Sequence, residues 1–111
     1  MAEFVKGDVV VLPFPFSDLS ASKKRPALVI APVQTHNDVI LCMITSKPAR
    51  DDSAIPLIET DFVQGGLPDA SNIRPNRLFT ADATLIVRPA GRLSAAKIAE
   101  VVAAIVRIVS E

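Results

Sequence analysis

The distribution of apolar residues changes once along the chain. Up to about residue 88, short apolar runs rich in β-branched residues alternate with polar stretches that hold Pro, Gly, Ser, Asn and Asp. Such runs are typical of strands separated by turns and loops. Beyond Ser94 the apolar residues recur at three- and four-residue steps, which predicts an amphipathic helix. The chain is therefore expected to begin with short strands and to end with one helix.

The first part of the chain predicts several short strands. They are expected at residues 9–14, 27–32, 39–45, 54–59 and 84–88, with a looser alternation at 71–80. Turn residues at 35–38 join the second and third strands into a hairpin. Polar loops are expected at 16–24 and 47–53, and the Gly65-Gly66 pair marks 62–68 as a flexible connection.

The last part of the chain predicts a helix of about 16 residues, with Ser94 as its N-cap. Its apolar positions are Ile98, Val101, Val102, Ile105, Ile108 and Val109. They form a wide stripe, so the helix is expected to pack against the sheet. These features predict one domain over residues 1–111 of the mainly β class, a small barrel or curled sheet of five to seven short strands with a C-terminal α-helix.

Charge and cysteine content limit the kinds of site. Acidic and basic residues balance at 12 each, so the chain has no overall positive field that would attract nucleic acid. A nucleic-acid site must be local, and the basic candidates are Lys23, Lys24 and Arg25, then Arg74, Arg77, Arg88 and Arg92. Cys42 is the single cysteine and lies in an apolar run, which excludes an internal disulfide and a zinc site of the Cys/His type. Without a signal peptide or a spanning apolar run, the expected location is cytoplasmic, with no membrane partner.

A cation and two hydroxyls lie at the edges of the most apolar predicted strands. Arg25 precedes the second strand, and Thr45 and Ser46 end the third. A guanidinium has planar donors that engage two phosphate oxygens at once, so this set suits phosphate chemistry. By themselves, the same residues also fit a solvated arginine at a strand start and hydroxyls that satisfy local backbone groups.

Four blocks of the sequence resemble the PemK/MazF family of toxin ribonucleases. They are Gly7-Asp8-Val9-Val10, Lys24-Arg25-Pro26-Ala27-Leu28-Val29-Ile30, Met43-Ile44-Thr45-Ser46, and residues 71–82 with Gly91-Arg92-Leu93 beyond them. Each block alone is a weak signal, but the four occur in the family's order over nearly the whole chain. The resemblance implies an SH3-like barrel that forms a homodimer and is inhibited by a cognate antitoxin protein.

The resemblance also implies an activity and its residues. The expected reaction is sequence-specific cleavage of single-stranded RNA by 2′-hydroxyl attack, with no metal or other cofactor, which arrests growth. Arg25 and Thr45 match the family's catalytic residues. The residues expected to bind RNA are Lys24, Ser46, Arg74, Asn76 and Arg77. Asn76 stands where some members have an aspartate, and an amide cannot act as a base, so the sequence does not identify the general base or acid.

Two other functions fit the same resemblance. A toxin on this scaffold can act without catalysis by binding a protein target such as gyrase. A member can also lose its activity, which the Asn76 replacement would suit. The end of the predicted helix has no aromatic residue of the kind that interface hot spots favour, and this weakens the binding alternative.

Overall fold

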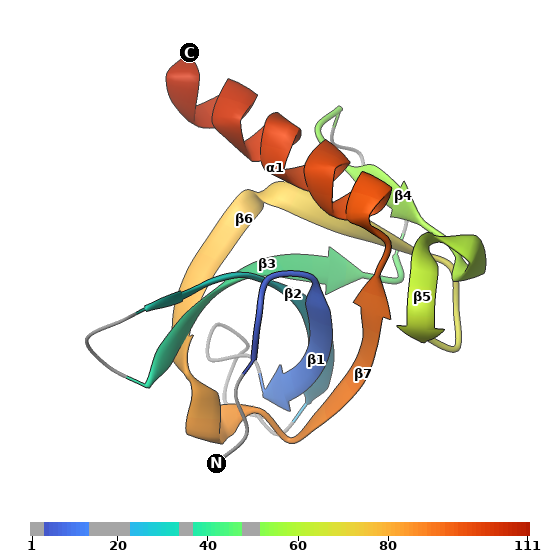
Figure 1. Cartoon of the computed structure of the whole chain (residues 1–111), viewed down its shortest axis with the longest axis vertical. Helices are drawn as coiled ribbons and strands as arrows, with labels where there is room; N and C mark the ends of the chain where they lie inside the picture. The colour runs from blue at the N-terminus through green and yellow to red at the C-terminus, as the bar shows by residue number, and fades with distance from the viewer. Residues whose placement is uncertain (1–3, 14–22, 34–36, 48–51) are drawn as a thin grey trace.

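The computed structural model of the chain describes residues 4–13, 23–33, 37–47 and 52–111, and it shows a mainly β protein with a C-terminal helix (Figure 1). The strands are β1 (Asp8–Pro13), β2 (Lys24–Val33), β3 (Asp38–Thr45), β4 (Ile55–Leu57), β5 (Phe62–Gly65), β6 (Ser71–Asp82) and β7 (Arg88–Leu93). Two short 3-10 helices, η1 (Glu59–Asp61) and η2 (Ala83–Leu85), lie between strands, and α1 (Ala95–Ser110) follows β7. The predicted fold class is confirmed.

The described strands form one antiparallel sheet in the order β4-β6-β3-β2-β1-β7-β5. The sheet curls strongly, so that its central strands surround a common interior as a half-barrel (Figure 1). The predicted hairpin of the second and third strands is confirmed as β2–β3, at the centre of the sheet. The short strands β4 and β5 lie at the two edges.

Apolar side chains cover both faces of the central strands. Successive residues of a strand point to opposite faces, and Val9 packs with Val101 of α1 while its neighbour Val10 packs in a separate cluster with Leu41 and Phe79. Burial on both faces explains why the sequence shows unbroken apolar runs here instead of a polar–apolar alternation.

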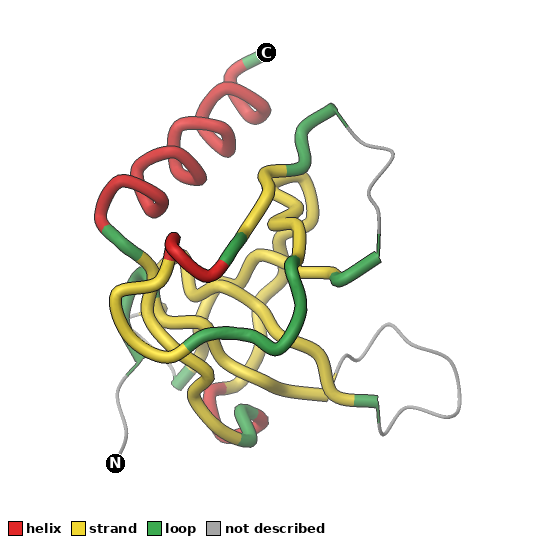
Figure 2. The backbone as a smooth tube through the Cα atoms, turned by 90° about the vertical axis from the view of Figure 1, so that its right-hand side faces the viewer, coloured by secondary structure: helices red, strands yellow, loops and turns green. Residues whose placement is uncertain are grey.

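Helix α1 covers one side of the sheet. It begins at the predicted cap, where the Ser94 hydroxyl oxygen accepts a hydrogen bond from the Lys97 backbone N–H at 3.2 Å. It lies across the outside of β6 (Figure 1) and along one side of the strands in the perpendicular view (Figure 2). Val101 and Ala104 are buried, whereas Val109 is 70% exposed, so only part of the predicted apolar stripe packs on the sheet. Within the described ranges, no helix is long and apolar enough to cross a membrane.

Two elements differ from the sequence prediction. The segment expected to be a flexible connection, 62–68, contains strand β5, and the strand expected at 84–88 is replaced by η2 and the later strand β7. Gly91 explains the pairing of β5 with β7, because a Cβ at this position would lie 2.5 Å from the Gln64 carbonyl oxygen. The glycine that signals a break in the sequence thus permits two backbones to approach closely. Residues 14–22, 34–36 and 48–51, and with them most of the predicted loops and the 35–38 turn, lie outside the described residues.

Candidate functional site

Several strands bring polar residues to one rim of the curled sheet. β1 and β3 end at this rim, at Pro13 and Thr45, whereas β2 and β7 begin there, at Lys24 and Arg88. The register confirms the arrangement, since Pro13 pairs with Lys24 and Val11 pairs with Arg88. Antiparallel neighbours run in opposite directions, so residues from distant parts of the sequence meet at the same rim.

A cleft of about 260 Å³ opens at this rim, and we call it the rim cleft. Its polar lining consists of Lys23, Lys24, Arg25, Lys47 and Arg88, the hydroxyl residues Thr45, Ser46 and Ser71, and Asp69. Its apolar lining comes from Val11, Pro26, Ile44, Leu67 and Pro68. The cleft therefore unites four of the seven residues predicted to be catalytic or to bind RNA: Lys24, Arg25, Thr45 and Ser46.

The five cations of the rim cleft have no ion-pair partner among the residues that the structure describes. Two cations elsewhere are neutralised: Arg92 Nη2 lies 3.0 Å from Asp8 Oδ1, and Lys97 Nζ lies 2.9 Å from Glu100 Oε1. Asp69 is the single carboxylate in the described lining. The positive potentials of the five side chains add inside the cleft, which favours a ligand with several negative charges.

Strand register sets Arg25 and Thr45 on one face of the sheet. The β2–β3 pairing ends at Ala27 and Met43, and Arg25 lies two positions before Ala27 while Thr45 lies two positions after Met43, so both residues share the face of that pair. Thr45 is only 9% exposed, and its Oγ1 accepts a hydrogen bond from the Lys47 backbone N–H at 3.2 Å. This bond fixes the Thr45 side chain and does not use the hydroxyl hydrogen, so the hydroxyl can still donate to a ligand.

The β6 residues predicted to bind RNA do not line the rim cleft. Arg74 pairs with Met43 and therefore shares a sheet face with Thr45, two positions further along β3. Asn76 and Arg77 are exposed in a bulge, where residues 75–77 have no partner on β3. Their part in ligand binding stays a prediction.

Cys42 makes a hydrogen bond next to that bulge. Its Sγ–H donates a hydrogen bond to the Arg74 carbonyl oxygen at 2.9 Å. Burial raises the pKa of the Cys42 thiol to about 12. A nucleophilic cysteine needs a thiolate near neutral pH, so this residue has a structural role, and the predicted buried thiol is confirmed.

The sequence did not single out Arg88, Asp69 or Ser71 as members of one site. Arg88 was one of several late arginines, and only its pairing with Val11 brings it to the rim. Asp69 and Ser71 lie at the turn into β6, where the Ser71 hydroxyl donates a hydrogen bond to the Asp69 carbonyl oxygen at 3.1 Å. All three residues lie at or just before the start of a strand. This position points to a common site only when the order of the strands in the sheet is known.

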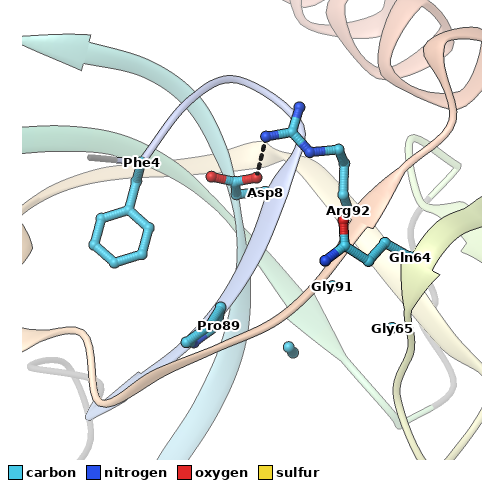
Figure 3. Close-up of a pocket in the computed structure, with 8 residues that line it drawn as sticks. Phe4, Asp8, Gln64, Gly65, Pro89, Gly91 and Arg92 are labelled. Carbon is cyan, nitrogen blue, oxygen red and sulfur yellow. Dashed lines mark ion pairs between the residues drawn. The ribbon is translucent and has the colours of Figure 1, made fainter. Parts of the chain in front are cut away.

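A second cavity of about 390 Å³ lies beside β1, β5 and β7 (Figure 3). Phe4 and Pro89 line it, and Asp8 faces Arg92 across it in the 3.0 Å ion pair. Because Asp8 neutralises Arg92, this cavity lacks the unpaired positive charge of the rim cleft. The rim cleft is therefore the better candidate for phosphate chemistry.

Comparison with known proteins gives a family and a fold. Residues 5–109 match the family model described as "PemK-like, MazF-like toxin of type II toxin-antitoxin system". A MazF from Deinococcus radiodurans has a similar structure, with a TM-score of 0.78 at 18% identity over 100% of each chain. No curated protein matches the chain in sequence.

Two mycobacterial structures are similar as well. An endoribonuclease in complex with its cognate antitoxin, from a mycobacterial species, has a TM-score of 0.76 at 12% identity, over 97% of this chain and 96% of that one. The Mycobacterium tuberculosis toxin MazF-mt6 has a TM-score of 0.71 at 17% identity, over 93% of this chain and 96% of that one. At these identities the likeness shows a shared fold.

Proposed function

The chain belongs to the PemK-like, MazF-like toxins of type II toxin-antitoxin systems, and from that premise we propose that it is a sequence-specific endoribonuclease that cuts single-stranded RNA without a metal and arrests growth. One observation carries the proposal: the rim cleft collects a fixed hydroxyl and five cations that have no ion-pair partner among the described residues, in a chain with no net charge. A polyanion with a reactive phosphodiester suits that combination.

In the proposed reaction the substrate supplies its own nucleophile. The 2′-oxygen of the nucleotide before the cut forms a bond to the adjacent phosphorus while the bond from phosphorus to the 5′-oxygen breaks. The products are a 2′,3′-cyclic phosphate and a 5′-hydroxyl end. The protein must accept the proton of the 2′-hydroxyl and stabilise the extra negative charge that develops on the phosphate oxygens. The departing 5′-oxygen takes up a proton from water to become the 5′-hydroxyl.

Arg25 and Thr45 stabilise that charge in our proposal. The guanidinium of Arg25 can donate two parallel hydrogen bonds to phosphate oxygens. Thr45, held by the Lys47 N–H, directs its hydroxyl hydrogen to the same phosphate or to the 2′-oxygen. Both residues lie at the rim on adjacent strands, so they can act on one phosphate.

Asp69 accepts the 2′-hydroxyl proton in our proposal. Of the described groups that line the rim cleft, the remaining polar ones are ammonium, guanidinium and hydroxyl groups, none of which is a useful base. The turn that carries Asp69 is held by the hydrogen bond from Ser71 to its carbonyl oxygen. Asn76 cannot act as the general base, and in our proposal the Asp69 carboxylate, on another segment, does so.

The five cations of the rim cleft also suit a protein partner. We expect the cognate antitoxin to present an acidic segment to the rim cleft, where it would compete with RNA for the same side chains. We further expect a homodimer, as the resemblance to the family implies.

The test is cleavage of a long unstructured RNA by the purified protein in EDTA. We expect discrete fragments with cyclic phosphate ends, and a loss of at least a hundredfold in rate for Arg25→Ala and for Thr45→Ala. Arg107→Ala is a matched control, because Arg107 is exposed on α1 and removes the same charge away from the cleft.

The outcomes separate the alternatives. If Arg25→Ala cuts at the wild-type rate, the site is wrong. If the wild type arrests growth without cutting RNA, the chain acts by binding a protein target.

A further inference from the structure

We propose that Arg88 and Lys24 form a second phosphate subsite in the rim cleft, which holds a phosphate next to the one that is cut. The inference rests on the proposed function, because it extends the same RNA beyond the scissile bond. It concerns residues on the opposite sheet face from Arg25 and Thr45.

The register places Arg88 and Lys24 on one face. Val11 pairs with Pro26 on one side and with Arg88 on the other, and directly paired residues of antiparallel strands point to the same face. Lys24 lies two positions before Pro26 and therefore shares that face. Arg25, one position away, points to the opposite face. All three cations nevertheless line the rim cleft, because they lie at strand ends where the cleft crosses the edge of the sheet.

The two sheet faces favour two phosphates over one. β2 and β7 flank β1, so Lys24 and Arg88 lie on the same face with one strand between them. Arg25 and Arg88 start from these two strands on opposite faces of the sheet. A phosphate held by Arg25 and Thr45 leaves Arg88 and Lys24 to meet the next phosphate along the RNA backbone.

The charge state of β7 supports this role. The strand carries two arginines, and they differ in their surroundings: Arg92 is paired with Asp8 at 3.0 Å, whereas Arg88 has no partner among the described residues. The Arg88 backbone is anchored by its pairing with Val11, which is only 8% exposed. An exposed guanidinium on a fixed backbone, beside a cleft, is available to an anion.

A contact to a neighbouring phosphate positions RNA without reading its sequence. Loss of Arg88 should therefore weaken binding for every sequence and leave the chemical step intact. Loss of Arg25 should instead remove the chemical step. Measurements of KM and kcat therefore distinguish the roles of Arg88 and Arg25.

The first test measures binding of an RNA that cannot be cut because its cut-site nucleotide lacks the 2′-hydroxyl. We expect Arg88→Ala to bind about tenfold more weakly than the wild type. Its slope of log affinity against log salt should be smaller by about 0.7, the value for one phosphate contact to a single strand. With the cleavable RNA, Arg88→Ala should raise KM and leave kcat within about twofold. Arg88→Lys should recover most of the binding, and Arg107→Ala should match the wild type.

The second test locates the phosphate. Once the cut is mapped, two RNAs are prepared in which the phosphate on either side of the cut site is replaced by a neutral methylphosphonate. At one position the wild type should lose about tenfold in affinity, and Arg88→Ala should lose nothing further. If Arg88→Ala binds and cuts as the wild type does, the subsite is wrong while the proposed function stands. If the wild type neither binds nor cuts RNA, the proposed function fails, and the subsite fails with it.

Discussion

Asp69 is the residue whose proposed role differs most from that of its neighbours. It places one carboxylate in a cleft that otherwise presents five cations. A negative charge at this position opposes the binding of RNA, so binding alone gives no reason to have it there. Acceptance of the 2′-hydroxyl proton does give such a reason.

The two effects of Asp69 can be measured separately in Asp69→Asn. The amide cannot accept the proton, so the single-turnover rate should fall by about a hundredfold or more. The same substitution removes a negative charge beside the phosphates, so affinity for uncleavable RNA should stay equal or increase. Asp52→Asn, at an exposed position outside the cleft lining, serves as the control for lost negative charge. A variant that keeps its rate would remove Asp69 from the mechanism.

Cys42 shows how a buried titratable group links stability to pH. Its pKa rises from 9.0 to about 12 on burial, so the folded state keeps its proton where the unfolded state has lost it. The stability that the neutral thiol provides is fully present below about pH 9 and is lost as the pH rises toward 12.

The expected loss is about 1 kcal/mol of unfolding free energy for each pH unit between 9 and 12. Urea denaturation at a series of pH values measures it. Cys42→Ala should be less stable at neutral pH and should lack this part of the alkaline decline. Identical declines for the variant and the wild type would contradict the assignment.

The sequence predicted those site residues whose side-chain chemistry and position within a family-like block both point to phosphate binding. Arg25 and Thr45 stood out because a cation and a hydroxyl flank apolar strands within blocks that resemble a known family. Arg88 and Asp69 could not be found in the same way, because neither belongs to those blocks, although both lie within three residues of one. They reach the rim cleft only through the β1–β7 pairing and through the turn into β6.

At the level of elements, Lys97 fastens α1 to the edge of the sheet. Its Nζ donates hydrogen bonds to the Pro56 carbonyl oxygen of β4 at 3.1 Å and to Glu100 Oε1 at 2.9 Å. It also lies 3.6 Å from Asp61 Oδ2 of η1. The side chain of Lys97 is only 12% exposed, so this one group ties the helix to two segments near the edge.

Replacement of Lys97 by Met should therefore lower the free energy of unfolding by about 1–3 kcal/mol, since the Pro56 carbonyl and the Asp61 carboxylate lose a partner. The Glu100 side chain is 54% exposed, and Glu100→Gln should change stability by about 0.5 kcal/mol or less. Urea denaturation of the three proteins gives both values. Equal stability of Lys97→Met and the wild type would show that the helix is held by its apolar contacts alone.

Secondary-structure elements were predicted best where a local sequence signal determines their type and their start. The period of α1 and its Ser94 cap are local, and both are confirmed. The strands β5 and β7 were missed, because Gly65, Pro89 and Gly91 signal breaks in isolated sequence. Their pairing depends on a close backbone approach that glycine permits, and such an approach is visible only in the folded sheet.

For the whole molecule, a net charge of zero conceals a strong separation of charge. Among the described residues, five cations and one acid line the rim cleft, whereas six cations and eight acids lie outside it. A polyanion is therefore attracted to one place and repelled elsewhere. The overall composition could exclude a general basic field, but it could not show this division, because the cations come from β2, β7 and the ends of loops.

The charge separation predicts how RNA binding depends on salt. Each phosphate that a protein neutralises on a single strand contributes about −0.7 to the slope of log affinity against log salt. If the five cations act together on one RNA, at least three phosphates are engaged, and the slope for uncleavable RNA should lie between about −2 and −3.5. Arg107→Ala, which removes a cation outside the cleft, should leave it unchanged. The slope is measured by fluorescence anisotropy at salt concentrations from about 50 to about 300 mM. A slope shallower than that of one phosphate contact would mean that the five cations do not bind the RNA backbone together. Any affinity for RNA would then come from contacts to the bases.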